Sequence, residues 1–206
     1  MPNPTSPSGS RRRTQAERVE LTRSRLLESA ARGFSTDGYA NVRLDDIARE
    51  AGYTRGAVYH LFANKEELAL AVVEWVGSTW RAEVGEPAEE IADPAERLLW
   101  TARAHARYCR RDIAAVLMSL RIEFADRDHP VGAALSGMIE PLKEELVKLI
   151  TRGRRAGSIP PGPSPRALAA AYLGVLEGVT TAVRGDSQDQ EITERAVRGL
   201  LGLPPR

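Results

Sequence analysis

The sequence has little of the chemistry that disulfides, metal centres and membrane spans require. Its 206 residues include one cysteine, Cys109, and three histidines. A single cysteine cannot form a disulfide within one chain, and it excludes zinc sites built on several cysteines. No apolar run approaches the roughly 20 residues that span a bilayer. We therefore expect a cytoplasmic protein with no membrane association and no metal or other cofactor.

The motifs of common enzyme classes are also missing. The sequence holds no HExxH motif, no phosphate-binding glycine loop and no GxGxxG pattern. Paired Glu-x-x-His motifs, which helical di-iron sites need, do not occur either. His105 and Cys109 are four residues apart on one predicted helix, but two ligands without a third make a poor metal site. We expect no catalytic residues and a function in binding.

The charge is divided unevenly along the chain, although the total is only +1. Residues 1–65 carry 11 basic and 7 acidic side chains, a net +4, and the other 141 residues carry 18 basic and 21 acidic ones, a net −3. This asymmetry is expected if only the first third of the chain meets a polyanion. Residues 1–16, with Arg11, Arg12 and Arg13, are predicted to form a disordered basic tail that either follows DNA phosphates or stays solvated.

The remainder is predicted to be all-α. Ala, Leu, Arg and Glu recur at helical spacing, and the alternation typical of strands is absent. The predicted helices cover 17–35, 44–51, 54–61, 65–83, 94–110, 112–125, 130–156, 165–184 and 192–201, with a loop over 85–94. Two short helices, 44–51 and 54–61, flank a turn that contains Gly52, which is typical of a helix-turn-helix.

The helix that begins at Thr54 has the features of a DNA recognition helix. Its first residues carry short or polar side chains, so that this end can enter a major groove about 12 Å wide. Thr54 is the predicted N-cap and a candidate phosphate contact. Arg55 is the candidate for reading guanine O6 and N7, and Ala57 for contact with a thymine methyl. Val58 and Phe62 are predicted to be core.

Residues 26–68 resemble the DNA-binding domain of the tetracycline-repressor (TetR) family of bacterial transcriptional regulators. The matching segments, in the family's order and spacing, are Leu26-Leu27, Ala30, Phe34, Gly38-Tyr39, Ile47-Ala48-Arg49-Glu50-Ala51-Gly52, Thr54-Arg55-Gly56-Ala57-Val58-Tyr59, Phe62 and Asn64-Lys65-Glu66-Glu67-Leu68. The resemblance implies an N-terminal three-helix helix-turn-helix domain followed by a C-terminal helical domain that binds a ligand and dimerises. We expect the first to cover 17–65 and the second 66–206.

The resemblance also implies DNA contacts at particular residues. Tyr59 and Lys65 match positions that contact the DNA backbone, and Arg23 matches another family position. Arg43 departs from the family, which commonly has a capping Thr or Ser there, and a leucine replaces a polar residue two positions after Tyr59, so we expect His60 to supply that backbone contact. The predicted DNA-binding set is Arg23, Arg43, Tyr53, Thr54, Arg55, Ala57, Tyr59, His60 and Lys65.

The last two predicted helices carry a candidate dimer interface. Small residues recur every four positions along helix 165–184, and two of them are glycines, each costing about 1 kcal/mol in a helix relative to alanine. Such a stripe indicates close packing of a neighbouring helix, either within the chain or in a second copy. Pairing both helices with their two-fold copies gives a four-helix interface. The predicted interface residues are Ala170, Gly174, Gly178, Ala182, Ile192, Ala196, Val197 and Leu200.

The middle helices supply candidates for an effector pocket, chosen as aromatic or soft side chains in an otherwise aliphatic body. Each has the alternative of being ordinary core. The predicted pocket residues are Trp80, Trp100, Tyr108, Met118, Phe124 and Tyr172, and Trp75 is a further aromatic candidate. Polar side chains that either orient a ligand or lie on the surface are Arg103, His105, Arg121 and Glu123.

These features favour a homodimeric repressor that is released from a palindromic operator when a small hydrophobic effector binds. Two-fold symmetry would set the recognition helices about one DNA turn apart or slightly more. The main alternative is a DNA-binding scaffold of the same fold that has a protein partner or no small-molecule effector. The partners expected in either case are double-stranded DNA and a second copy of the chain.

Overall fold

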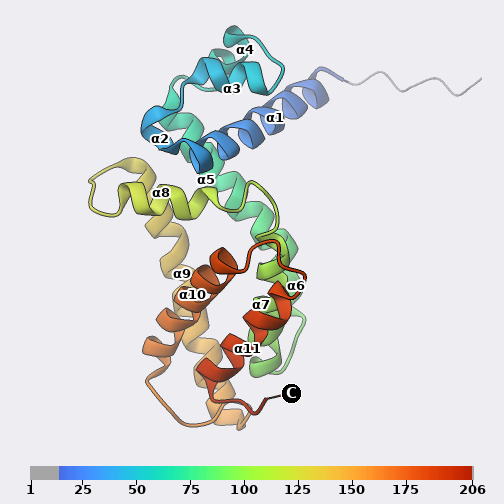
Figure 1. The fold of residues 1–206 in the computed structure, drawn as a ribbon, viewed down its shortest axis with the longest axis vertical. Coiled ribbons are helices and arrows are strands. Elements are labelled where there is room, and N and C mark those ends of the chain that lie inside the picture. Colours follow the sequence, from blue (N-terminus) through green and yellow to red (C-terminus); the bar gives the residue numbers. More distant parts are fainter. Residues whose placement is uncertain (1–13, 206) are drawn as a thin grey trace, which may run out of the picture.

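The computed structural model describes residues 14–205, and over that range every regular element is a helix (Figure 1). The predicted all-α class is therefore confirmed. A small N-terminal unit, here called the head, lies at one end of the molecule, and a longer helical unit, the body, extends from it (Figure 1). The predicted contacts of Arg11, Arg12 and Arg13 lie outside the described residues.

The head consists of four helices. They are α1 (Gln15–Thr36), α2 (Gly38–Asn41), α3 (Leu44–Glu50) and α4 (Arg55–Leu61). A capping box starts α1, because the Thr14 hydroxyl accepts from the Glu17 N–H while the Glu17 carboxylate accepts from the Thr14 N–H. Helix α1 thus begins inside the segment predicted as tail, and α2 is a turn of helix that the sequence pattern did not predict.

The core of the head forms where one face of α1 meets α3 and α4. Its fully or nearly fully buried side chains are Leu26, Leu27, Ala30, Phe34, Ile47, Val58 and Phe62. Burial of Val58 and Phe62 confirms that both are core residues, which fix α4 on the other helices of the head. The buried Ser29 hydroxyl donates to the Ile47 carbonyl at 3.1 Å, which anchors α3 on α1.

A long helix, α5 (Lys65–Trp80), runs from the head into the body. Asn64 caps it by accepting from the Glu67 N–H. A π-helical turn, η1 (Arg81–Gly85), and a short helix, α6 (Glu86–Glu89), follow directly. The predicted loop over 85–94 was therefore wrong for its first half, because Pro87 is tolerated in the first turn of α6.

Five further helices build the body. They are α7 (Pro94–Tyr108), α8 (Val116–Phe124), α9 (Pro130–Ala156), α10 (Pro165–Ala182) and α11 (Asp189–Leu201). Helices α7, α9, α10 and α11 pack around a second core that includes Leu98, Ile150, Tyr172 and Val197. Helix α8 crosses between this bundle and the head (Figure 1). No helix between residues 14 and 205 combines the length and apolarity that crossing a membrane would need.

Candidate nucleic-acid interface and effector cavity

The helix-turn-helix is formed by α3, a tight turn and α4. Gly52 in the turn has a φ of +77°, a left-handed conformation that disfavours residues with a Cβ. Thr54 occupies the N-cap of α4 as predicted, but its side chain makes no capping hydrogen bond. Arg43 occupies the N-cap of α3, also without a capping hydrogen bond. Both side chains are exposed, which leaves them free to meet phosphates.

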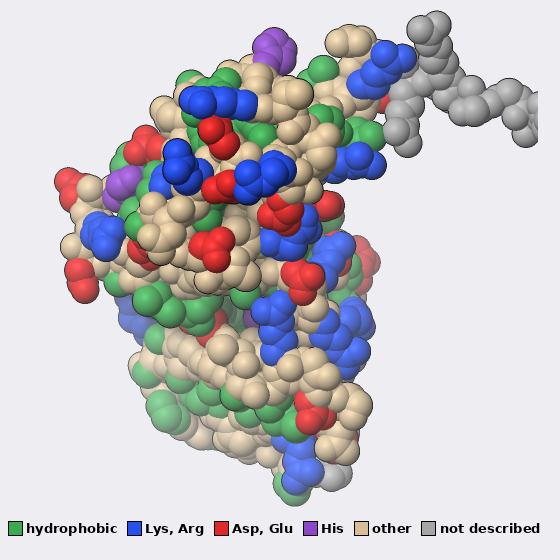
Figure 2. Space-filling view, turned by 45° about the horizontal axis from the view of Figure 1, so that its top comes forward, with side chains coloured by type: hydrophobic (Ala, Val, Ile, Leu, Met, Phe, Trp, Pro, Cys, Tyr) green, Lys and Arg blue, Asp and Glu red, His purple; other side chains and the backbone are tan. Residues whose placement is uncertain are grey.

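The predicted base-reading residue, Arg55, lies at the exposed N-terminus of α4. Its Nη1 donates to Asp45 Oδ2 at 3.2 Å, and its guanidinium carbon lies 5.2 Å from the centre of the Tyr59 ring. Tyr59 and His60 are exposed, while Tyr53 and Ala57 are half-buried. Figure 2 shows Lys and Arg side chains spread over the head and interleaved with Asp and Glu. The predicted recognition end is therefore accessible and already ordered by its neighbours.

Arg23 is half-buried, because its guanidinium lies over the Phe62 ring at 5.3 Å from its centre. A cation over an aromatic face is held by the ring quadrupole. The contact joins α1 to the residue that ends α4. Arg23 therefore stays a candidate phosphate contact whose stem is fixed beside the recognition helix.

Lys65, at the start of α5, contacts the end of α2 within the head. Its ammonium group donates to the carbonyls of Tyr39 at 2.7 Å, Ala40 at 3.2 Å and Val42 at 3.2 Å, and lies 4.5 Å from the Tyr39 ring centre. An ammonium has three donors, and here all three have acceptors within the protein. In this structure Lys65 therefore satisfies the end of α2, and its contact with the DNA backbone stays a prediction.

Glu123 of α8 holds the opposite end of α2. Its carboxylate accepts from the Tyr39 N–H at 2.6 Å and from the Ala40 N–H at 2.9 Å. These first N–H groups of a helix have no partner within it, and an anion there is favoured by the helix dipole. Glu123 is thus neither a ligand-orienting group nor a loose surface residue. Together with Lys65 it forms what we call the joint between head and body.

Aromatic packing completes the joint. Phe124 stacks on the His129 ring with centres 4.4 Å apart, and the Tyr39 ring meets both rings at 5.0 and 5.7 Å. His129 Nε2 lies 3.4 Å from a carboxylate oxygen of Glu66 at the start of α5. The last turn of α8, the first turns of α5 and α9, and α2 of the head therefore meet at one point.

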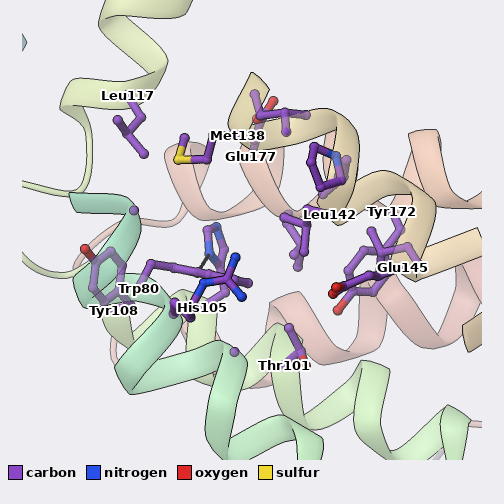
Figure 3. Close-up of a pocket in the computed structure, with 18 of the residues that line it drawn as sticks. Trp80, Thr101, His105, Tyr108, Leu117, Met138, Leu142, Glu145, Tyr172 and Glu177 are labelled. Carbon is purple, nitrogen blue, oxygen red and sulfur yellow. Dashed lines mark hydrogen bonds between the residues drawn. The ribbon is translucent and has the colours of Figure 1, made fainter. Parts of the chain in front are cut away.

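A cavity of about 1640 Å³ lies in the body below this joint. Its walls come from α5, η1, α6, α7, α8, α9 and α10. Figure 3 shows Leu142 of α9 pointing into it from the side opposite Trp80 and His105. Its volume exceeds the roughly 300–1,000 Å³ of ordinary ligand pockets, so that a ligand with a long tail or a large head group would fit.

Four of the six predicted pocket residues lie in the wall of this cavity. Trp80, Tyr108, Met118 and Tyr172 line it. Two predicted residues lie elsewhere: Phe124 belongs to the joint, and Trp100 packs against the core outside the cavity wall. A helical period shows which residues share a face but not which faces converge, and this is why both were misplaced.

Other cavity residues were missed because they are ordinary apolar or charged residues at helical spacing. Figure 3 shows Leu117, Met138, Leu142 and Glu145 in the wall with the aromatic residues. Of the polar candidates, Arg121 lines the cavity and pairs with Glu177 of α10, whereas Arg103 pairs with Glu194 at 2.6 Å. Arg103 therefore braces α7 against α11.

A chain of polar groups runs through the cavity wall at His105. The Trp80 indole N–H donates to His105 Nδ1 at 3.0 Å, and His105 Nε2 lies 3.4 Å from Cys109 Sγ. Because an indole only donates, the neutral ring carries its proton on Nε2. Burial lowers the pKa of His105 to about 4 and raises the pKa of the Cys109 thiol to about 11. His105 is therefore uncharged at neutral pH, and Cys109 remains a thiol of low reactivity.

Charged side chains of both signs also line the cavity. The cationic ones are Arg81, Arg97, Arg121, Lys148, Arg152, Arg155 and Arg184, and the anionic ones are Glu74, Glu86, Glu89, Glu145 and Glu177. The wall therefore combines apolar and aromatic surface with a small excess of positive charge. This combination suits a ligand that has an apolar body and an ionised end.

The face of α10 that carries the small residues is open to solvent. Ala170, Gly174, Gly178 and Ala182 are exposed, and a Cβ placed on either glycine would meet nothing within 4 Å. On α11, the side chains of Ile192, Ala196 and Leu200 are partly exposed. Val197 is fully buried against the body core, so its assignment to the dimer interface was wrong.

Comparison with known families gives two matches. The model for bacterial regulatory proteins of the tetR family matches residues 26–72, and that for the tetracyclin repressor-like C-terminal domain matches residues 94–200. Together these segments contain the helix-turn-helix, the residues of the joint and most of the cavity wall.

Curated relatives agree with this assignment. The HTH-type transcriptional regulator CymR of Pseudomonas putida is 44% identical over 66 residues, which is 32% of each chain. The A-factor receptor protein of Streptomyces griseus is 26% identical over 174 residues, or 84% of this chain and 58% of the relative. The chain thus matches between about a third and three fifths of the length of these two relatives.

Solved structures share the fold. AibR in complex with isovaleryl coenzyme A and operator DNA is 22% identical, with a TM-score of 0.77 over 89% of this chain and 100% of that one. FadR of Bacillus subtilis in complex with stearoyl-CoA is 17% identical, with a TM-score of 0.72 over 88% and 99%. With family models matching both its head and its body, the chain belongs to the TetR family of bacterial transcriptional regulators.

Proposed function

We propose that the protein is a homodimeric repressor that binds a palindromic operator through its head and is released when a small, largely hydrophobic effector enters the cavity of the body. The observation that carries this proposal is the joint. Glu123, at the end of the cavity-lining helix α8, accepts two backbone hydrogen bonds from the head. A change in the cavity wall therefore has a short mechanical route to α2.

The mechanical route from the cavity to the head runs along α8 and α5, which line the cavity and also reach the joint. Helix α8 contributes Leu117, Met118 and Arg121 to the cavity, and α5 contributes Val73, Gly77 and other residues before it reaches the head through Lys65. An effector that favours a different spacing of α8 and α5 would tilt the head. Two tilted heads in a dimer no longer match half-sites one DNA turn apart. Release requires the effector to bind the tilted state more tightly.

The dimer is supported by the open α10 face beside the partly exposed residues of α11. Two glycines on an exposed helix face are costly in a monomer, and an approaching helix offsets that cost through close packing. A second copy supplies such a helix by two-fold symmetry. We assign residues up to Lys65 to the head and the following residues to the body.

The effector class is proposed from the cavity wall. Aromatic and aliphatic side chains suit an apolar chain or ring, and the surrounding arginines suit an anionic end. Two structural neighbours carry coenzyme A thioesters, and this makes acyl-coenzyme A compounds the first class to screen. Fatty acids and neutral aromatic compounds form the comparison arms.

Two experiments test the proposal. A gel-shift with the promoter next to the protein's own gene should show salt-sensitive, palindrome-dependent binding, because phosphate contacts release counterions. A thermal-shift screen of the three compound classes should then find a ligand that raises the melting temperature and lowers operator affinity. Specific binding to DNA without any stabilising ligand would favour the scaffold alternative, in which the body binds a protein partner or nothing.

A further inference from the structure

Two carboxylates lie in the first turn of α3, on the part of the head that carries the recognition helix. Asp45 pairs with Arg55 across the turn at 3.2 Å, whereas Asp46 pairs with Arg49 within α3 at 2.6 Å. All four side chains are substantially exposed, since even the Asp45 side chain keeps 42% of its accessible surface. Exposed ion pairs add little to stability, so neither carboxylate is required for folding.

A carboxylate beside the tip of a recognition helix opposes the approach of a polyanion. The resulting loss of affinity is the same for every DNA sequence, unless the carboxylate also acts on a residue that reads bases. Asp45 does so, because its oxygen fixes Nη1 of Arg55 while the Tyr59 ring covers one face of the same guanidinium. Asp46 has no such contact in the part of the chain that the structure describes.

We propose that Asp45 is a specificity-determining residue that positions Arg55 for guanine and penalises other uses of its charge. This inference rests on the proposed DNA-binding function. A guanidinium has five N–H donors in a fixed fork. With one taken by Asp45, others remain to contact O6 and N7 of a guanine in the bidentate manner.

Arg55 discriminates guanine from other bases because Asp45 opposes its alternative contact, which is a DNA phosphate. At a base other than guanine, Arg55 gains most by turning to a phosphate. That turn leaves the Asp45 carboxylate unpaired close to the DNA, where like charges repel. Specific recognition often relies on such a repulsive element as well as on an attractive one. Removal of the Asp45 charge should free Arg55 to contact phosphates at any sequence.

The test compares Asp45→Asn with the matched variant Asp46→Asn in the full-length chain. The DNA probes are the duplex that the wild type enriches from a random pool, all its single-base half-site variants, and a random duplex of equal length. For the wild type, one guanine position should discriminate by about tenfold or more. We call the affinity for guanine at this position, divided by the affinity for the other bases, the ratio. In Asp45→Asn this ratio should fall several-fold, while affinity for the random duplex rises.

The control Asp46→Asn separates the positioning of Arg55 from the simple loss of one negative charge. Asp46→Asn removes the same charge from the same helical turn, so it should raise affinity for all the duplexes alike and leave the ratio intact. In an Arg55→Ala background, Asp45→Asn should no longer change the ratio at that guanine, because the residue through which Asp45 acts is gone. Unchanged melting curves would show that all the variants fold.

Three outcomes would overturn the inference. They are a retained ratio in Asp45→Asn, equal effects of the two Asp variants on the ratio, and an effect of Asp45→Asn that persists without Arg55, which would make Asp45 itself the base contact. Each leaves the proposed function standing. A wild type that shows no base-dependent binding to any duplex would instead refute the proposed function and this inference with it.

Discussion

Replacement of Glu123 by Gln should loosen the joint between head and body without disturbing the shape of either. The carboxylate accepts from the Tyr39 and Ala40 N–H groups at 2.6 and 2.9 Å. Gln keeps the length of the side chain but has one acceptor oxygen and no charge, so that one bond is lost and the other is weakened. Hydrogen bonds to charged groups contribute about 1.5–3 kcal/mol each. We therefore expect a local cost of about 2 kcal/mol.

Hydrogen–deuterium exchange measures this cost where it arises. A local loss of about 2 kcal/mol corresponds to exchange roughly 30 times faster at the Tyr39 and Ala40 amides in Glu123→Gln. Amides in the middle of α1 should keep their protection. Glu83→Gln, which removes an exposed ion-pair partner of Arg111 elsewhere in the body, is the matched control and should leave α2 unchanged. Equal protection of the Tyr39 and Ala40 amides against exchange in wild type and Glu123→Gln would refute the idea that Glu123 holds α2.

Two further predictions concern the body. The folded-state pKa of His105 is about 4, below the ordinary 6.5, so its contribution to stability is complete above pH 6.5 and is lost as the pH falls toward 4. The free energy of unfolding in urea should thus drop by about 2 kcal/mol from pH 7 to pH 5, and the same slope in His105→Gln would contradict this assignment. A charge on the open α10 face, Gly178→Glu, should leave the fold intact and give monomers in sedimentation velocity; a dimer of undiminished stability would place the interface elsewhere.

Local features were largely predictable from the sequence. The helix 130–156 was predicted with the bounds that the structure has, because Pro130 fits a first turn and Gly157, at φ +79°, ends the helix in a left-handed conformation. The predicted burial of Val58 and Phe62 is confirmed as well. Where a helix ends, and which of its faces is apolar, depend on residues that are close together in the sequence. The sequence pattern therefore shows both directly.

Contacts between distant segments were not predictable in the same way. Lys65 matched a family position for DNA contact, yet its ammonium satisfies carbonyls of α2. Glu123 lies more than 80 residues from its hydrogen-bond donors, and no pattern on α8 distinguishes it from a surface glutamate. Val197 has the spacing of an interface residue but faces the core of its own chain. Such outcomes depend on how helices pack, and helical periodicity leaves this open.

In the proposed function, two heads related by two-fold symmetry read one operator. Selection of binding sites from a random duplex pool by the full-length protein tests it most directly, followed by the stoichiometry of binding to the enriched duplex. We expect an inverted repeat whose half-site centres are about one DNA turn apart or slightly more, bound by two chains or a multiple of two. Affinity for it should fall steeply as the salt concentration rises. Enrichment of a single unrepeated site bound by one chain, or no enrichment at all, would contradict it.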